Sequence, residues 1–319
     1  MVIGAAVEHA GIPASEIENK GIGESMQGGG NIGRNAAVRL GMIVVGVGGG
    51  TESMSTAPGT SKPGPDGAPA FWLSPGNPDT PDAPPFNMAL TVGDNTAHLA
   101  GVTREETDEW AFESHRRAIR AIDEGRFDAE IVPVDLPGGR QSTTDEHPRR
   151  NSSLEKLATL GLLNAGLDDA VTTAGNSSGL NDAAAALVLC SRAYAEAHGL
   201  TPLAAIRGWA SIGLDPVETG LAPAKALPKA GISLADLQSV ATNEAFASTA
   251  VASTRIMGLD HDLVNVNGSG CSLGHPIACP GARMILTMVN ELIRADAQWG
   301  SVAMCAAGDM GSATVIERL

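Results

Sequence analysis

The 319-residue sequence predicts an α/β protein, on three observations. Apolar runs typical of buried strands alternate with segments whose apolar residues recur at helical spacing. Only 3% of the residues are aromatic, whereas 39 are glycine, which favours close packing of small side chains between helices and sheets. Hydrophobic residues make up 43% of the chain, enough for a sizeable core.

The first part of the chain contains patterns for two helices and two strands. Gly11 is placed to end the first helix, and a loop containing three consecutive glycines precedes the second. The last apolar run has the uninterrupted character of a parallel strand that is buried on both faces. In chain order we expect a helix, a short strand, a helix and a buried strand at Val2–Ala10, Ile17–Met26, Ile32–Leu40 and Met42–Val47.

The middle of the chain begins with a predicted surface loop at residues 56–87, where Pro and Gly are frequent. Thr91–Gly101 has a helical pattern, and Thr103 and Glu106 form a capping box at the start of a helix that runs to about residue 124. A short strand is expected at Ile131–Val134. Residues 171–198 then predict a glycine-rich loop, a strand and a helix.

The last third predicts a second alternating set of elements. The helix at Gly281–Arg294 has an apolar stripe along one face, so it should pack on a sheet. We expect five strands, at Leu203–Ile212, Ser239–Asn243, Leu263–Val266, Ser301–Ala306 and Ala313–Arg318.

Composition excludes several classes of protein. The net charge of −15 argues against a nucleic-acid partner, because phosphate binding relies on clustered Lys and Arg. The sequence has no apolar run long enough to span a bilayer and no N-terminal export signal, so we expect a cytoplasmic protein. The four cysteines have neither the spacing of a metal site nor the density of a disulfide framework, and Cys190, in an apolar run, is expected in the core.

One histidine and one cysteine lie in settings suited to catalysis. His275 follows a glycine-rich turn in VNVNGSGCSLGHPIACPG, and Cys305 precedes a second glycine-rich turn in MCAAGDMG. An imidazole and a thiol beside exposed backbone N–H groups are the parts needed for acyl or enolate chemistry. The alternative interpretation of His275 is a structural histidine whose hydrogen bonds are satisfied by backbone groups.

These two stretches resemble the thiolase family, and so do four further segments in the same order. The four are GTESMS at 50–55, DEHPR at 145–149, TAGNSSG at 173–179 and NEAFA at 243–247. The resemblance implies an αβαβα layered fold of two similar halves. It divides the chain into an N-terminal half at 1–58 and 172–199, an inserted loop domain at 59–171 and a C-terminal half at 200–319.

The resemblance also implies roles for three residues. His275 matches the histidine that activates a cysteine nucleophile and helps to bind the thioester oxygen. Asn243 matches the asparagine that holds a water in the first oxyanion site. Cys305 matches the cysteine that exchanges the α-proton of the acyl group, which requires a lowered thiol pKa or a nearby base.

Further positions bear on substrate binding. Ser178 matches a serine near the pantetheine arm of coenzyme A, although it stands in what is otherwise a simple turn. The backbone at Ala307 and Gly308 matches the second oxyanion site. The family prefers glycine where Ala307 and Asp309 stand, so a positive φ at either position would introduce strain.

The chain departs from the family in its first half. Thiolases carry an N-terminal strand, and between the equivalents of Leu40 and Ile43 they carry a strand, a loop with the nucleophilic cysteine and a buried helix. Here neither is found, so we expect the N-terminal half to be incomplete and to expose apolar surface. Cys271, four residues before His275, is a possible replacement nucleophile, although the family has small or apolar residues there.

Three functions are compatible with these features. The first is a thiolase-family acyl-CoA acyltransferase, acting by Claisen condensation or thiolysis of a 3-ketoacyl-CoA. The second is a retro-aldol lyase that works without a nucleophile, and the third is a non-catalytic protein that binds coenzyme A. In each case the partner is CoA or acyl-CoA, with no bound cofactor or metal, and the assembly is expected to be a homodimer or homotetramer. Basic residues that either bind the CoA phosphates or form an ordinary solvated helix face are Arg116, Arg117, Arg120, Arg149 and Arg150.

Overall fold

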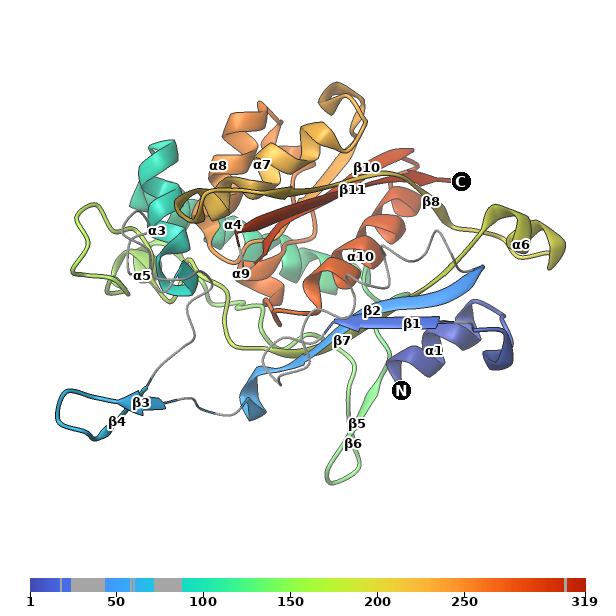
Figure 1. Cartoon of the computed structure of the whole chain (residues 1–319), viewed down its shortest axis with the longest axis horizontal. Helices are drawn as coiled ribbons and strands as arrows, with labels where there is room; N and C mark the ends of the chain where they lie inside the picture. The colour runs from blue at the N-terminus through green and yellow to red at the C-terminus, as the bar shows by residue number, and fades with distance from the viewer. Residues whose placement is uncertain (18, 24–43, 58, 60, 72–87, 307–308) are drawn as a thin grey trace.

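Two β-sheets and the helices around them make up the core of the protein (Figure 1). The computed structural model describes residues 1–17, 19–23, 44–57, 59, 61–71, 88–306 and 309–319. The first sheet has the strand order β1-β2-β7 and the second has the order β8-β11-β10-β9. Strands of the first sheet are β1 (Asn19–Gly23), β2 (Val45–Ser53) and β7 (Asp182–Cys190). Strands of the second are β8 (Ala204–Gly213), β9 (Ser239–Thr242), β10 (Trp299–Ala306) and β11 (Met310–Arg318).

The first sheet is built around the glycine-rich strand β2. Val45 and Val47 are buried, and the glycines that follow leave room for close neighbours. β2 pairs in parallel with β1 and antiparallel with β7. Among the described residues, two short helices accompany this sheet: α1 (Val2–His9), which contacts β7, and α6 (Arg192–Ala197), which follows β7.

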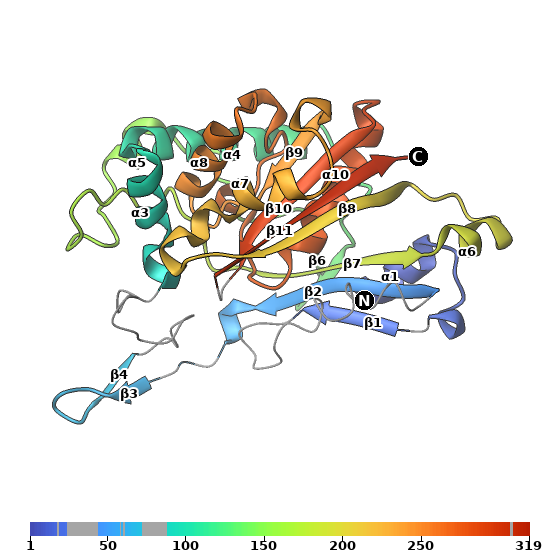
Figure 2. The same ribbon diagram turned by 45° about the horizontal axis from the view of Figure 1, so that its top comes forward.

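The second sheet repeats this pattern with one additional strand. β10 pairs in parallel with β9 and antiparallel with β11, and β8 adds an antiparallel edge with a bulge opposite Val315 and Ile316. Figure 2 shows its four strands side by side above the first sheet. Helix α7 (Ala222–Ala226) covers the outer face, and α8 (Ala247–Met257) packs beside α7.

Helix α10 (Pro280–Arg294) lies between the two sheets (Figure 1). It contacts β9, β10 and β11 on one side and β2 and β7 on the other. Its buried side chains Met284, Met288 and Leu292 recur at helical spacing and pack with Val302 and Ile316 of the second sheet. The order of layers is therefore α1, first sheet, α10, second sheet and α7, which confirms the αβαβα architecture.

The segment between β2 and β7 forms helices and hairpins beside the second half. Helices α3 (Met88–Ala100) and α4 (Arg104–Asp123) pack against α8, and α5 (Leu154–Ala158) packs on α4. Thr103 and Glu106 form the expected capping box. Two hairpins extend away from the core (Figure 1): β3 (Ser61–Pro63) with β4 (Pro69–Phe71), and β5 (Val134–Leu136) with β6 (Arg140–Ser142).

Most of the expected elements are present, with three corrections. The predicted strand at Ile131–Val134 is wrong, because the strand begins at Val134, where it can pair with β6. The strand expected at Leu263–Val266 is reduced to one parallel bridge between Val264 and Val240. Cys190 is exposed at the end of β7 rather than in the core. The predicted helix at Ile32–Leu40 lies outside the described residues, and the division into three domains stays a prediction.

Close contact between the sheet and the loop after His275 depends on Gly50. A Cβ atom at this position would lie 1.9 Å from the carbonyl oxygen of Ala278, which is backbone and cannot rotate away. We expect Gly50→Ala to lower the free energy of unfolding by about 1–3 kcal/mol. The matched control is Gly4→Ala in α1, where a Cβ meets nothing within 4 Å and the helix should gain slightly. Equal denaturation midpoints for both variants would contradict the packing argument.

Candidate active site

The candidate site lies where parallel strands β9 and β10 end. Ala303 of β10 is paired with Thr242 of β9, so Asn243 and Cys305 follow at the same edge of the sheet. The backbone N–H of Asn243 donates to the Ala303 carbonyl at 3.1 Å and extends the pairing by one residue. In open α/β sheets, ligands bind at the carboxyl ends of the strands, and this is where Asn243 and Cys305 lie.

Asn243 and His275 face each other at this edge. The Nδ2 atom of Asn243 lies 3.4 Å from both Nδ1 and Nε2 of the imidazole. Asn243 is fully buried, and its Oδ1 has no hydrogen-bond partner among the described residues. A buried acceptor without a donor is costly, so this oxygen is suited to receive a hydrogen bond from a water or a ligand.

His275 is a neutral imidazole at physiological pH. Burial lowers its pKa to about 4, and the positive charge of Arg283 acts in the same direction. A neutral ring donates from one nitrogen and accepts at the other, whereas an imidazolium would only donate. His275 can therefore donate a hydrogen bond to a thioester oxygen without carrying a charge.

The loop at 173–181 is hydrogen-bonded to the segment that follows Asn243 and to the backbone of His275. The N–H of Ser178 donates to the carbonyl of Ala245 at 3.0 Å, two residues after Asn243. The Oδ1 of Asn181 accepts a hydrogen bond from the backbone N–H of His275 at 3.1 Å. Ser178 is thus next to the predicted site residues, and Asn181 is a contact that the sequence did not indicate beyond its place two residues after the TAGNSSG motif.

Glu244 is the second residue that the sequence analysis missed. Its carboxylate is fully buried and accepts hydrogen bonds from Trp110 Nε1 (2.8 Å), Ser114 Oγ (2.7 Å), Asn265 Nδ2 (2.7 Å) and the Cys271 N–H (3.1 Å). These donors come from α4 and from the loop that leads to His275. The position of Glu244 in the NEAFA segment, directly after Asn243, is the signal that could have identified it.

Cys305 lies near the end of β10, buried and paired with Gly311 of β11. Burial raises its pKa to about 11, so it is a thiol at neutral pH. Among the described residues it makes no hydrogen bond to His275. Ala307 and Gly308 lie outside the described residues, whereas Asp309 has a φ of +61°. Asp309 therefore occupies a left-handed conformation that favours glycine.

The remaining cysteines carry raised thiol pKa values as well. Cys271 is buried, its sulfur lies near the carbonyls of Asn176 (3.8 Å) and Glu244 (3.7 Å), and burial raises its pKa well above the ordinary value. Burial raises the pKa of Cys279 to about 12 despite the nearby Arg283, and partial desolvation raises the pKa of the largely exposed Cys190. Since only thiolates are good nucleophiles, these raised pKa values disfavour attack by the four thiols, and the burial of Cys271 gives no support to its role as a replacement nucleophile.

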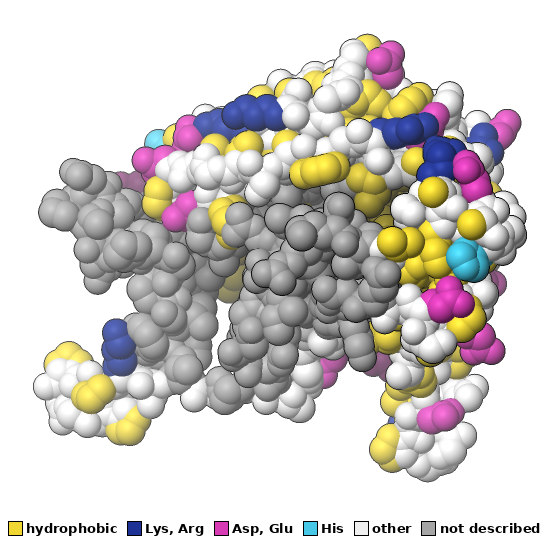
Figure 3. Space-filling model, turned by 45° about the vertical axis from the view of Figure 1, so that its right-hand side comes forward, with side chains coloured by type: hydrophobic (Ala, Val, Ile, Leu, Met, Phe, Trp, Pro, Cys, Tyr) yellow, Lys and Arg dark blue, Asp and Glu magenta, His cyan; other side chains and the backbone are white. Residues whose placement is uncertain are grey.

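Four of the five arginines considered for CoA phosphate binding make side-chain contacts with the protein: Arg116, Arg117, Arg120 and Arg150. Arg117 is buried and donates to the Val264 carbonyl at 2.5 Å, and Arg116 donates to Glu113 at 2.6 Å. Arg150 pairs with Asp123 at 2.5 Å. On the face drawn in Figure 3, Lys and Arg side chains lie in small groups, several of them beside acidic ones. These contacts favour a structural role for those four arginines over a role in phosphate binding.

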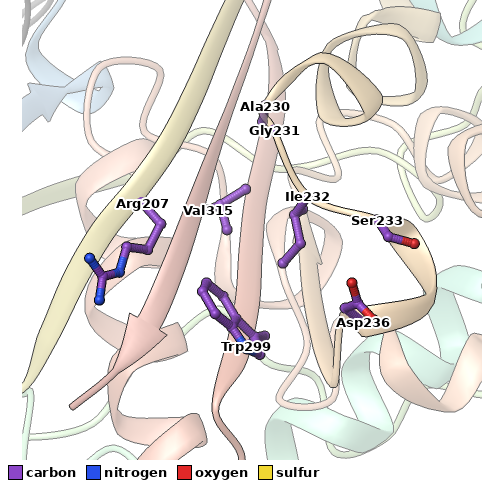
Figure 4. Close-up of a pocket in the computed structure, with 8 residues that line it drawn as sticks. All are labelled: Arg207, Ala230, Gly231, Ile232, Ser233, Asp236, Trp299 and Val315. Carbon is purple, nitrogen blue, oxygen red and sulfur yellow. The ribbon is translucent and has the colours of Figure 1, made fainter.

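A cavity of about 430 Å³ lies elsewhere on the second sheet (Figure 4). It is lined by Arg207, Ile232, Asp236 and Trp299, together with neighbouring small residues. Trp299 begins β10, whereas Cys305 is near its end, so the two lie about 20 Å apart along the strand. The cavity is therefore separate from the candidate active site.

The described residues contain neither a candidate metal site nor a candidate membrane span. No three His, Cys, Asp or Glu side chains among them are grouped so that they could hold a metal ion. No helix in the same part of the chain has the length and apolar character needed to cross a membrane.

Comparison with known proteins decides the family. The family model for the thiolase N-terminal domain matches residues 32–193, and that for the thiolase C-terminal domain matches residues 200–318. The chain belongs to the thiolase family. It is 43% identical over 242 residues to an acetyl-CoA acetyltransferase of Escherichia coli (strain K12), in a match that covers 73% of this chain and 60% of the relative. This thiolase-family chain thus spans about three-fifths of that relative's length.

Solved structures of thiolases share the fold. The crystal structure of the Bacillus anthracis acetyl-CoA acetyltransferase is 34% identical, with a TM-score of 0.85 over 100% of this chain and 91% of that one. The human mitochondrial 3-ketoacyl-CoA thiolase in complex with CoA is 27% identical, with the same TM-score of 0.85 over 99% and 90% of the two chains. The layered architecture of this chain is therefore that of the thiolase family.

Removal of the Glu244 carboxylate should destabilise this site. Glu244→Ala leaves four buried donors without their acceptor, so we expect the free energy of unfolding to fall by about 3 kcal/mol or more. The control is Glu109→Ala on the exposed side of α4, which should change it by less than about 0.5 kcal/mol. Urea denaturation measures both, and a change for Glu244→Ala as small as that of the control would rule out the proposed network.

Proposed function

We propose that this chain acts on acyl-CoA thioesters as a thiolase-family acyl-CoA acyltransferase. The observation that carries the proposal is the pair of Asn243 and His275 at the carboxyl edge of β9 and β10, with a free buried acceptor on Asn243 and Cys305 on the neighbouring strand. The membership of the family and the CoA complex of the human relative support CoA thioesters as substrates. A homodimer or homotetramer in the cytoplasm, without a bound cofactor, stays part of the proposal.

His275 and Asn243 would bind the thioester oxygen. A neutral imidazole donates to the carbonyl oxygen, and Asn243 Oδ1 accepts from a water that donates to the same oxygen. Both contacts strengthen as the oxygen gains negative charge in an enolate or a tetrahedral intermediate. Because the site is buried, these hydrogen bonds act with little screening by water.

Cys305 would exchange the proton at the α-carbon. Its thiolate removes the proton to form the enolate, and its thiol returns the proton in the reverse direction. With a thiol pKa of about 11, the protonated form dominates at pH 7, so proton return is favoured over proton removal.

The raised thiol pKa values bear on how the acyl group is transferred. An acyl-cysteine requires a thiolate nucleophile, and burial raises the pKa of all four thiols, which disfavours the thiolate form at neutral pH. In condensation, the enolate of one acyl-CoA would then attack the thioester carbon of a second, forming the carbon–carbon bond and releasing CoA. In thiolysis, the CoA sulfur attacks the 3-keto carbon and the same bond breaks. In this proposal both substrates are bound at the same time.

The first test is the order of substrate binding. In thiolysis of acetoacetyl-CoA we expect slow turnover and intersecting initial-velocity lines, because no acyl-enzyme forms. His275→Ala should reduce kcat/KM by about 100-fold or more, since it removes the donor to the oxyanion. His98→Ala, an exposed residue of α3, is the matched control and should have no effect.

Several results would overturn this proposal. Parallel initial-velocity lines would show that the reaction proceeds through an acyl-enzyme. An acetylated cysteine found by mass spectrometry after incubation with acetyl-CoA would show the same. Cleavage of a β-hydroxyacyl-CoA in the absence of free CoA, without thiolysis, would instead favour the lyase. Absence of both activities in a protein whose melting temperature rises with CoA would favour a binding protein.

The second test is the pH dependence of α-proton exchange. Below a thiol pKa of about 11, the thiolate fraction of Cys305 rises about tenfold with each pH unit. We therefore expect the exchange of acetyl-CoA methyl protons in D₂O to accelerate about tenfold per unit from pH 7 to pH 9. NMR measures the exchange, and Cys305→Ser should abolish the acceleration. A rate that is flat over this range would exclude Cys305 as the base.

A further inference from the structure

His147 lies between two loops of the candidate site, although the proposed function gives it no role. It belongs to the DEHPR segment, which follows β6 and returns to the second half of the chain. Its Nδ1 lies 2.8 Å from the carbonyl oxygen of Ser272, three residues before His275. Because a carbonyl only accepts hydrogen bonds, Nδ1 carries the proton in this contact.

The opposite edge of the ring touches the second loop. A Cβ atom built on Gly179 would lie 2.5 Å from Nε2 of His147 and 3.2 Å from its Cδ2, distances too short for a side chain. The backbone of Gly179 and the imidazole are therefore in direct contact. His147 fills the space between the loop at 173–181 and the helical turn α9 (Gly270–Leu273).

Both of these segments fix the backbone of His275. Asn181, two residues after Gly179, accepts the hydrogen bond from the His275 N–H at 3.1 Å. Gly274 has a φ of +91°, and a Cβ there would lie 2.4 Å from Cγ of Asn181, so the two are in close contact. A shift of either segment moves the backbone from which the imidazole projects.

The ring of His147 is itself supported by α4. His115, buried on that helix, stacks on it with a centroid distance of 6.1 Å and an interplanar angle of 21°. Nδ1 of His115 accepts a hydrogen bond from the backbone N–H of Arg149 at 3.1 Å. Burial lowers the pKa of His115 to about 4, so it remains a neutral acceptor and keeps the DEHPR segment in place.

We propose that His147 is a positioning residue for the candidate site: by its hydrogen bond to Ser272 and its contact with Gly179, it holds the backbone of His275 in register with Asn243. The inference rests on the proposed role of His275 at the acyl oxygen. It concerns geometry, however, and can be tested without turnover.

Two substitutions separate the hydrogen bond from the filled volume. His147→Phe keeps a ring but has no donor, whereas His147→Asn places an amide N–H near the position of Nδ1. In NMR titrations of ring-labelled histidines, the signal that disappears in His275→Gln identifies His275. We expect that signal to titrate near pH 4 in the wild type and in His147→Asn. In His147→Phe its pKa should move toward 6.5 by half a unit or more, because a loosened backbone admits water to the ring.

Turnover supplies a second readout. A misplaced imidazole affects the transition state more than substrate binding, so His147→Phe should lower kcat about tenfold with little change in KM, and His147→Asn should restore most of it. His98→Phe on the exposed side of α3 is the matched control and should leave both parameters unchanged.

Gly179 provides an independent variant. Gly179→Ala should displace His147 and shift the His275 titration in the same direction. In a His147→Ala background the same change should add little, because the clash is gone, giving a non-additive double-mutant cycle.

The outcomes separate this proposal from the proposed function. A wild type without turnover, combined with the expected NMR shifts, would reject the acyltransferase and retain the positioning role. An unchanged His275 titration in folded His147→Phe would reject the positioning role, whatever the activity. So would additive effects of Gly179→Ala and His147→Ala, or equal effects of the Phe and Asn substitutions.

Discussion

The buried carboxylate of Glu244 is the constraint on which the candidate site depends. Taking a carboxylate out of water is costly unless its oxygens accept several hydrogen bonds, and here the four donors come from two separate parts of the chain, α4 and the loop that leads to His275. The hydrogen bonds from Trp110 and Ser114 join α4 to the end of β9. The hydrogen bond from the Cys271 N–H joins the loop that leads to His275 to the same carboxylate. Asn243 is the adjacent residue, so the same network sets its position.

Close backbone contacts complete this arrangement. A Cβ on Gly270 would lie 2.4 Å from the carbonyl oxygen of Glu244, and one on Gly50 would meet Ala278. Glycine at these two positions allows the GHP loop to lie directly on β9 and β2. Neither position could carry a larger side chain without displacing the loop.

The electrostatics of the site favour neutral groups. Burial keeps the His275 imidazole uncharged and the Cys305 sulfur protonated at physiological pH. Such groups stabilise a developing oxyanion by donating hydrogen bonds rather than by opposite charge. The same burial is unfavourable for a thiolate, which disfavours an acyl-cysteine on any of the buried thiols Cys271, Cys279 and Cys305.

The sequence by itself determined the family and the alternation of strands and helices, and it predicted His275, Asn243 and Cys305 as site residues, because motifs and periodicity are local properties. It placed α3, α4 and α10 nearly correctly for the same reason. Only the tertiary structure decided what depends on distant contacts. Pairing with β6 places the strand predicted at 131–134 at Val134–Leu136 instead. Burial raises the pKa of the Cys271 thiol, which its sequence position does not predict. The contacts of Glu244 and His147 also depend on the tertiary structure. Each joins residues more than a hundred positions apart, and a local sequence pattern does not predict such contacts.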